Sequence, residues 1–206
     1  MPKAALDCLN GTGGAQAATT WNDGLDEHNA RPLKLRDDLD RYDGLARFLH
    51  WIFAAGIIYA SIAGYTVARL SSGPERDVLS RLNMSIATVL IVLFPLRVYW
   101  KFARIEPRAL PGVSQAQRTL ANGVHALMYV TIFVVLASGF LMVPNGYSFF
   151  GLVEIHTPFV NGPLTEEFFV IHRAACALLA GLVMLHVLAV VKHQLISRID
   201  VLRRML

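Results

Sequence analysis

The sequence predicts an all-α integral membrane protein built as a four-helix bundle. Of its 206 residues, 54% are apolar and only 17% are charged, with a mean hydropathy of +0.45. Soluble globular domains average roughly 25% charged residues. The apolar residues gather in four long runs, each close to the length of about 20 residues that a helix needs to cross a bilayer. The same composition excludes a disordered chain, a collagen-like chain and a disulfide scaffold.

The four runs follow a polar N-terminal stretch. They contain no Lys, Arg, Asp or Glu over 21 residues from Phe48 to Ala68, 15 from Leu82 to Leu96, 25 from Thr119 to Val143 and 18 from Ala174 to Val191. Because flanking side chains reach the interface, we expect spans over 46–69, 79–101, 117–143 and 167–194. Residues 1–40 are polar and predict a disordered cytoplasmic arm, which leaves 41–206 as the membrane domain.

The basic residues are distributed unevenly along the chain. Residues 1–43 have a formal charge of −3 and the rest of the chain has +7. The loop between the second and third runs and the C-terminal tail are basic, whereas residues 144–167 contain no Lys or Arg. Because basic loops stay in the cytoplasm, we expect a multi-pass protein of the bacterial inner (cell) membrane with both termini cytoplasmic. The positive charge then reflects topology and does not indicate a nucleic-acid partner.

Histidines inside the predicted spans are the first candidate site residues, because an ionisable group is costly in lipid. His172 and His186 are 14 residues apart on the fourth run, a rise of about 21 Å that leaves both near one helix face. His50 enters the first span at the depth of His186. Two imidazoles on different helices at one depth are the axial pair of a six-coordinate b-type haem. A hydrogen bond between helices is the alternative for each histidine.

Two further polar residues belong to the same predicted end of the bundle. His125 shares a helix face with Tyr129. We expect it to contact a haem propionate or a quinone, with a polar packing contact as the alternative. Arg97, near the end of the second run, is expected to pair with a propionate, and its alternative role is to fix the topology. Cys176 lies inside an apolar run and is expected to behave as a small buried hydrophobe.

Several short motifs, taken in order, resemble the prokaryotic cytochrome b561 family. They are Arg41-Tyr42, Leu49-His50-Trp51, Val124-His125-Ala126-Leu127-Met128-Tyr129, Val170-Ile171-His172-Arg173, Leu185-His186-Val187-Leu188, Lys192-His193 and the ending Val201-Leu202-Arg203-Arg204-Met205. The resemblance covers about residues 41–206. It implies a four-helix b-type cytochrome with haem between its helices, which passes electrons between a donor and the quinone pool of the respiratory chain.

The chain departs from this family at one position. The family pattern has two haems on four ligands, one from each of the first two spans and two from the fourth. His50, His172 and His186 match, but the second-span position, 14 residues before Arg97, is Asn83. We therefore expect one haem b, on His50 and His186. A second site at His172 is expected to be absent or five-coordinate. Its alternative ligands are Met84 and His156.

The resemblance leaves three functions open. The first is an electron-transfer cytochrome that exchanges electrons with quinone. The second is an enzyme similar to superoxide:ubiquinone oxidoreductase. The third is a haem-poor membrane anchor subunit of a complex with a redox partner protein. The sequence does not decide whether the chain is itself an oxidoreductase, and it names no donor.

Overall fold

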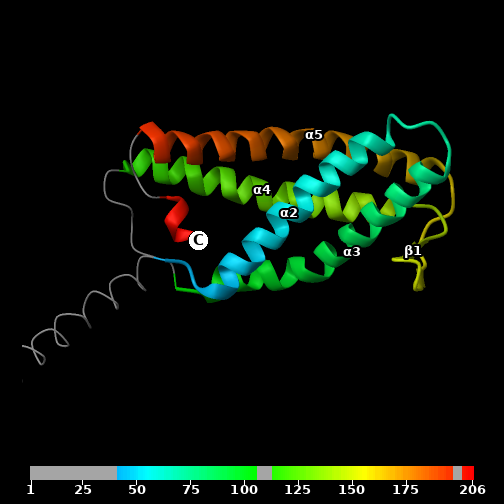
Figure 1. Ribbon diagram of the computed structural model, residues 1–206, viewed down its shortest axis with the longest axis horizontal. Coiled ribbons are helices and arrows are strands. Elements are labelled where there is room, and N and C mark those ends of the chain that lie inside the picture. The colour runs from blue at the N-terminus through cyan, green and yellow to red at the C-terminus, as the bar shows by residue number, and fades with distance from the viewer. Residues whose placement is uncertain (1–40, 106–112, 197–200) are drawn as a thin grey trace, which may run out of the picture. The chain divides into compact units, whose positions relative to one another are not determined.

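Four long helices make up most of the computed structural model, which describes residues 41–105, 113–196 and 201–206. They are α2 (Gly44–Val67), α3 (Pro74–Ala103), α4 (Gln115–Leu141) and α5 (Pro163–Val191), and successive helices run in opposite directions (Figure 1). Each is long and apolar enough to cross a membrane. The predicted all-α membrane four-helix bundle is therefore confirmed. The predicted arm over residues 1–40 lies outside the described residues.

Local signals fix where the helices begin. The Asp43 carboxylate accepts a hydrogen bond from the backbone N–H of Ala46 at 2.6 Å, as an N-cap does. Pro74 and Pro163 open α3 and α5, a position where the missing N–H costs nothing. Ser114 and Gln117 form a reciprocal capping box at the start of α4. The helices therefore extend into polar sequence beyond the apolar runs, as α3 does from Pro74.

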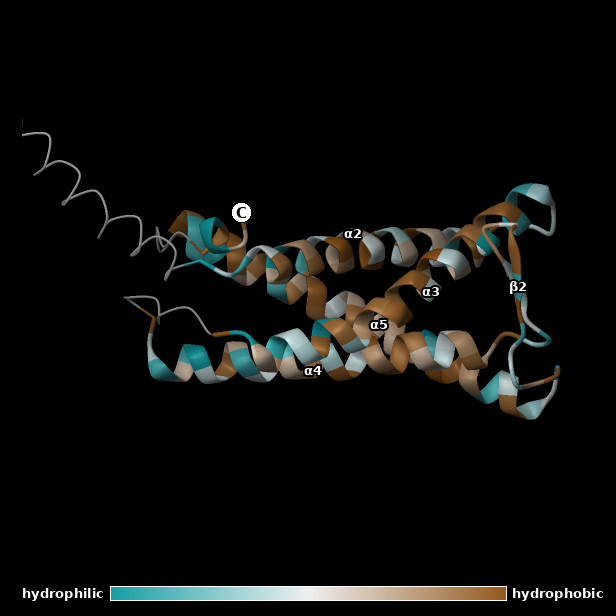
Figure 2. Ribbon diagram, turned by 90° about the horizontal axis from the view of Figure 1, so that it is seen from below, coloured by the Kyte–Doolittle hydropathy of each residue, from teal (hydrophilic) through white to brown (hydrophobic). Residues whose placement is uncertain are grey.

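The helices form two antiparallel pairs. α2 packs along α3 and α4 along α5, and the pairs meet mainly where α3 packs against α4. Figure 2 shows these pairs as two layers whose middle parts are the most hydrophobic. An apolar cluster near mid-length joins them through Phe53, Leu90, Ile132, Leu136 and Leu179. Gly56 allows the close approach of α2 and α3, because a Cβ there would lie 3.0 Å from the Leu90 side chain.

The two ends of the bundle are built differently. At one end α2 and α4 begin and α3 and α5 finish. We call it the histidine end, after His50, His125 and His186; Arg97 lies at the same end. The opposite end, called the hairpin end, carries the antiparallel strands β1 (Tyr147–Phe149) and β2 (Val153–Ile155), with Tyr147 opposite Ile155. Figure 2 shows this hairpin running between the two helix layers.

Two hydrogen bonds connect the hairpin to α3. The Tyr147 and Thr88 hydroxyls lie 2.5 Å apart, and the backbone N–H of Phe150 donates to the Ser85 hydroxyl at 2.9 Å. Ser85 is fully buried, so its hydroxyl needs such a partner. The sequence predicts only a loop between the third and fourth spans, and the two strands were not expected from it.

Candidate haem site

Three imidazoles lie close together at the histidine end. They come from three helices: His50 from α2, His125 from α4 and His186 from α5. The His50 and His186 ring centres are 6.5 Å apart, and those of His125 and His186 are 5.3 Å apart. The fold thus gathers three of the histidines that the sequence singled out, and it leaves His172 at the other end of α5.

The ring distances discriminate between the two pairs. Two metal–nitrogen bonds of about 2 Å, with each ring centre about 1.1 Å further out, put two axial imidazoles about 6.3 Å apart. The 6.5 Å separation of His50 and His186 fits this arrangement. The 5.3 Å separation of His125 and His186 is too short for an iron between them. The residues present therefore fit a bis-histidine haem, on the first pair.

Buried guanidinium groups surround these histidines. An Arg97 nitrogen lies 3.5 Å from His50 Nδ1, and the Arg97 guanidinium lies over the rings of Phe53 and Tyr129. The Nε atoms of Arg97 and Arg104 are buried and have no hydrogen-bond partner. Because a buried donor without a partner is costly, these atoms indicate that an acceptor belongs here.

Positive charge at this end is poorly balanced by the acids of the described residues. Among the residues that the structure describes, Asp43 is the one acid at the histidine end, and its carboxylate accepts hydrogen bonds from the Trp100 indole at 2.8 and 3.0 Å. Lys101 adds a further cation, 4.5 Å from the centre of the Tyr129 ring. An anionic group with several acceptor oxygens, such as the two propionates of haem, fits this surplus.

His172 lies at the hairpin end, against α4. Its Nδ1 is 3.0 Å from the backbone oxygen of Val135, and its Nε2 is 3.4 Å from Cys176 Sγ. A Cβ at Gly139 would come within 3.0 Å of this ring, so the glycine permits the contact. Both imidazole nitrogens thus have protein partners, as the hydrogen-bonding alternative expects, and Cys176 is a hydrogen-bond partner as well as an apolar side chain.

No second imidazole from the described residues faces His172 in a ring contact. Asn83 stands on α3 with a buried Oδ1 that has no hydrogen-bond partner, and its amide nitrogen is the nearest atom to the ideal Cβ position of Gly64, at 3.9 Å. His156 is exposed beyond β2. Met84 is one position further along α3, turned by about 100° from Asn83.

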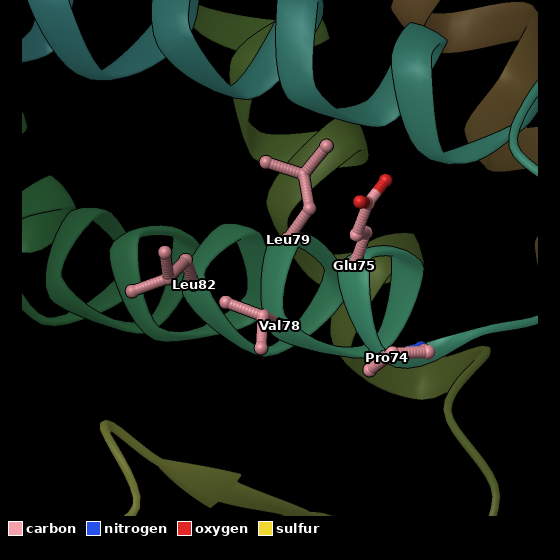
Figure 3. Close-up of a pocket in the computed structure, with 5 residues that line it drawn as sticks. All are labelled: Pro74, Glu75, Val78, Leu79 and Leu82. Carbon is pink, nitrogen blue, oxygen red and sulfur yellow. The ribbon is translucent and has the colours of Figure 1, made fainter.

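A groove elsewhere on the bundle is a poor candidate for a cofactor. It runs along the first turns of α3 and is lined by Pro74, Glu75, Val78, Leu79 and Leu82 (Figure 3). It offers no imidazole, thiol or guanidinium group, and it lies at the hairpin end. Its lining suits lipid chains better than a haem.

Some residues of the site were not found from the sequence. Arg104 and Lys101 read there as ordinary basic residues after a span, and the buried Nε of Arg104 and the stacking of its guanidinium on Tyr42 at 4.3 Å depend on the fold. The aromatic residues Tyr42, Trp100 and Tyr129, near these cations or on facing helices, could have indicated such contacts, since aromatic faces attract guanidinium and ammonium groups.

Four membrane-length helices, paired imidazoles and arginine Nε atoms that are buried without a hydrogen-bond partner together define a membrane cytochrome of the b type. The comparisons agree: the family model described as prokaryotic cytochrome b561 matches residues 41–206. The chain belongs to the prokaryotic cytochrome b561 family. It is also 27% identical to cytochrome b561 homolog 2 of Escherichia coli (strain K12) over 179 residues, which are 81% of this chain and 92% of that protein. Membership makes it a multi-pass bacterial membrane cytochrome that binds haem b and acts in electron transfer.

Proposed function

We propose that this cytochrome holds one haem b at the histidine end, with His50 and His186 as axial ligands, and exchanges electrons there between a donor and the quinone pool. The observation that carries the proposal is the 6.5 Å separation of the two rings, on the first and last spans. Bound haem supplies a one-electron redox couple, while the chain supplies its ligands, its charges and its exclusion from water.

Arg97 and Arg104 are proposed to hold the propionates. Their unpartnered Nε atoms provide donors, and guanidinium groups bind carboxylates through paired hydrogen bonds. An imidazole that binds iron through Nε2 carries its proton on Nδ1, so it cannot accept from Arg97 through that nitrogen. Arg97 is therefore expected to turn from His50 towards a propionate when haem is bound. His125, beside His186, is proposed to contact a propionate or the quinone.

A second haem at His172 has little support. A partner imidazole is replaced by Asn83, and Cys176 Sγ is the neighbour of Nε2, the nitrogen that iron would need. The single-haem proposal follows, with the redox centre at one end of the bundle. Because the loop 144–167 lacks basic residues, we propose that the histidine end faces the cytoplasm and that quinone reaches it from the inner membrane.

Haem content and axial ligation provide the test. The purified wild-type protein is expected to contain about one haem per chain, with the six-coordinate low-spin b-type spectrum. His50→Ala and His186→Ala should each lose that spectrum, because a bis-imidazole iron loses one ligand. His125→Ala is the matched control: it removes the imidazole 5.3 Å from His186 that is not a proposed axial ligand, so the six-coordinate low-spin character should remain.

Three outcomes would contradict the proposal. A low-spin spectrum retained in both ligand variants refutes the ligand pair. Two six-coordinate haems per wild-type chain refute the single site and imply that Met84, His156 or another group completes the second one. A wild-type protein without any b-type band points instead to the anchor-subunit function.

A further inference from the structure

The last six described residues, 201–206, turn back along the start of α2. We call them the C-terminal strap; they include a 3-10 turn, η2 (Leu202–Arg204). The backbone N–H of Tyr42 donates to the Arg204 oxygen at 3.2 Å, the Trp51 indole N–H donates to the Met205 oxygen at 2.8 Å, and the Arg47 guanidinium donates to the Leu206 oxygen. Three consecutive residues of the strap thus supply acceptors to three donors at the histidine end.

The side-chain donors stand beside the proposed iron ligand. Arg47, His50 and Trp51 are spaced i, i+3 and i+4 on α2 and therefore share one face. The Trp51 and His50 rings meet edge to face with centres 5.6 Å apart. A ligand that takes the place of the strap would lie next to a haem held by His50.

Exposed hydrogen bonds from two side chains of α2 hold the strap. Its hydrogen bonds from Trp51 and Arg47 are exposed, and its turn η2 contains no buried residue. An exposed hydrogen bond that exchanges with water contributes little net free energy. The Arg47 Nε is in addition buried without a partner, so this side chain has a donor that the strap leaves unused. A ligand with carbonyl acceptors can therefore take the place of the strap at the Arg47 and Trp51 side chains.

We propose that Arg47 and Trp51 form the binding site for the quinone headgroup, and that the strap occupies this site when quinone is absent. The inference rests on the proposed exchange of electrons with quinone. It adds the residues that bind the quinone headgroup and the segment of the chain that competes with it. A quinone ring presents carbonyl oxygens, which accept from N–H donors as the strap oxygens do. Its ring packs on the exposed Trp51 indole, and its apolar tail follows exposed side chains such as Phe48 into the bilayer.

Binding of decylubiquinone, a short-chain quinone, to the purified haem-loaded protein tests the competition. Deletion of residues 201–206 should lower its Kd about fivefold, because the competing acceptors are removed. In this deletion background Trp51→Phe should raise the Kd about fivefold, since it keeps a ring and loses the donor. Trp100→Phe is the matched control and should leave the Kd unchanged, because its indole is held by Asp43.

Trypsin cleavage after Arg203 and Arg204 supplies a readout that is independent of affinity. Saturating decylubiquinone should accelerate cleavage at these two sites in the wild-type protein several-fold, and it should have no such effect on Trp51→Phe at the same quinone concentration. A Kd that deletion leaves unchanged or raises, or a cleavage rate that quinone does not increase, overturns the competition. A Kd insensitive to Trp51→Phe in the deletion background overturns the site.

The outcomes also separate this inference from the proposed function. A wild-type protein with a b-type spectrum that binds decylubiquinone independently of the strap and of Trp51 refutes only the inference. A wild-type protein that binds no decylubiquinone even after deletion of the strap, with its spectrum intact, refutes the exchange with quinone itself. Each variant is compared with the wild type by its haem spectrum, which reports an intact fold.

Discussion

Arg97 carries a permanent positive charge into the interior of the histidine end. It lies 3.5 Å from His50, with its Nε buried and without a partner. A charge acts strongly on its neighbours where the effective dielectric constant is low. A haem held by His50 loses one unit of positive charge on reduction, so Arg97 favours the reduced form.

Replacement of Arg97 by Gln should therefore lower the reduction potential of the haem. A loss of about 1–2 kcal/mol corresponds to about 40–90 mV for one electron, and a redox titration of the b-type absorption band measures it. Arg69→Gln is the control, because its guanidinium stacks on Tyr65 at the hairpin end. Equal potentials in the wild type and Arg97→Gln would show that this charge does not act on the haem.

Single residues of the site were predictable from the sequence to different degrees. His50, His186 and Arg97 stand out because ionisable groups are conspicuous in apolar runs. The distances between the histidine rings were not predictable. The 6.5 Å between His50 and His186 and the 5.3 Å between His125 and His186 depend on how α2 and α4 each pack near α5. Sequence spacing gives depth along one helix and says nothing about the rotation of its neighbour.

At the scale of elements, the connection that contains the β1–β2 hairpin depends on residues with unusual backbone angles. Four residues in and beside it have positive φ: Asn145, Gly146, Phe150 and Gly151. At Gly146, with φ of 110°, a Cβ would collide with the Ile155 backbone oxygen, whereas at Gly151, with φ of 75°, it would meet nothing within 4 Å. Both glycines thus relieve backbone strain, but only Gly146 also prevents a collision.

Gly146→Ala should consequently destabilise the protein more than Gly151→Ala. We expect a cost of about 2 kcal/mol or more at Gly146 and about 1 kcal/mol at Gly151, where left-handed strain acts alone. Thermal unfolding in detergent, followed by circular dichroism, compares the two midpoints. A midpoint for Gly146→Ala at or above that of Gly151→Ala would contradict the collision with the Ile155 oxygen.

The long helices were predictable and the hairpin was not, for a physical reason. Apolar runs of membrane length carry a strong signal, because lipid admits few alternatives. Strands of three residues show too little alternation to be recognised. Gly151, in the turn that connects β1 to β2, was the available indication of a hairpin. Pro74 similarly marked the start of α3, which begins ahead of the expected span because its first turn is polar.

At the scale of the whole molecule, the proposed orientation in the membrane rests on the distribution of charge. The described basic residues around the histidine end include Arg47, Lys101 and Lys192. The hairpin end has acids at Glu154, Glu166 and Glu167, and charges of both signs around the start of α3: Arg69, Glu75, Arg76, Asp77 and Arg81. Basic segments are retained in the cytoplasm during insertion.

Reporter fusions at the C-terminus test that orientation. A fusion to a protein that is fluorescent only in the cytoplasm should be active, and a fusion to an enzyme that is active only in the periplasm should be silent. Fusions within residues 144–160 serve as the control and should give the opposite pattern. A periplasmic signal from the C-terminus would place the histidine end outside and reverse the side from which quinone and donor approach.

The division into two helix pairs has a mechanical consequence. The pairs are joined by packing at mid-length and by the hairpin at one end, whereas at the opposite end the C-terminal strap joins them through exposed hydrogen bonds. On the proposed ligation, iron bonds to α2 and to α5, which belong to different pairs and are the first and last helices of the bundle. A bound haem would then link the first helix of the chain to the last. Its removal is expected to weaken the association of the two helix pairs at the histidine end as well as to abolish the absorption band.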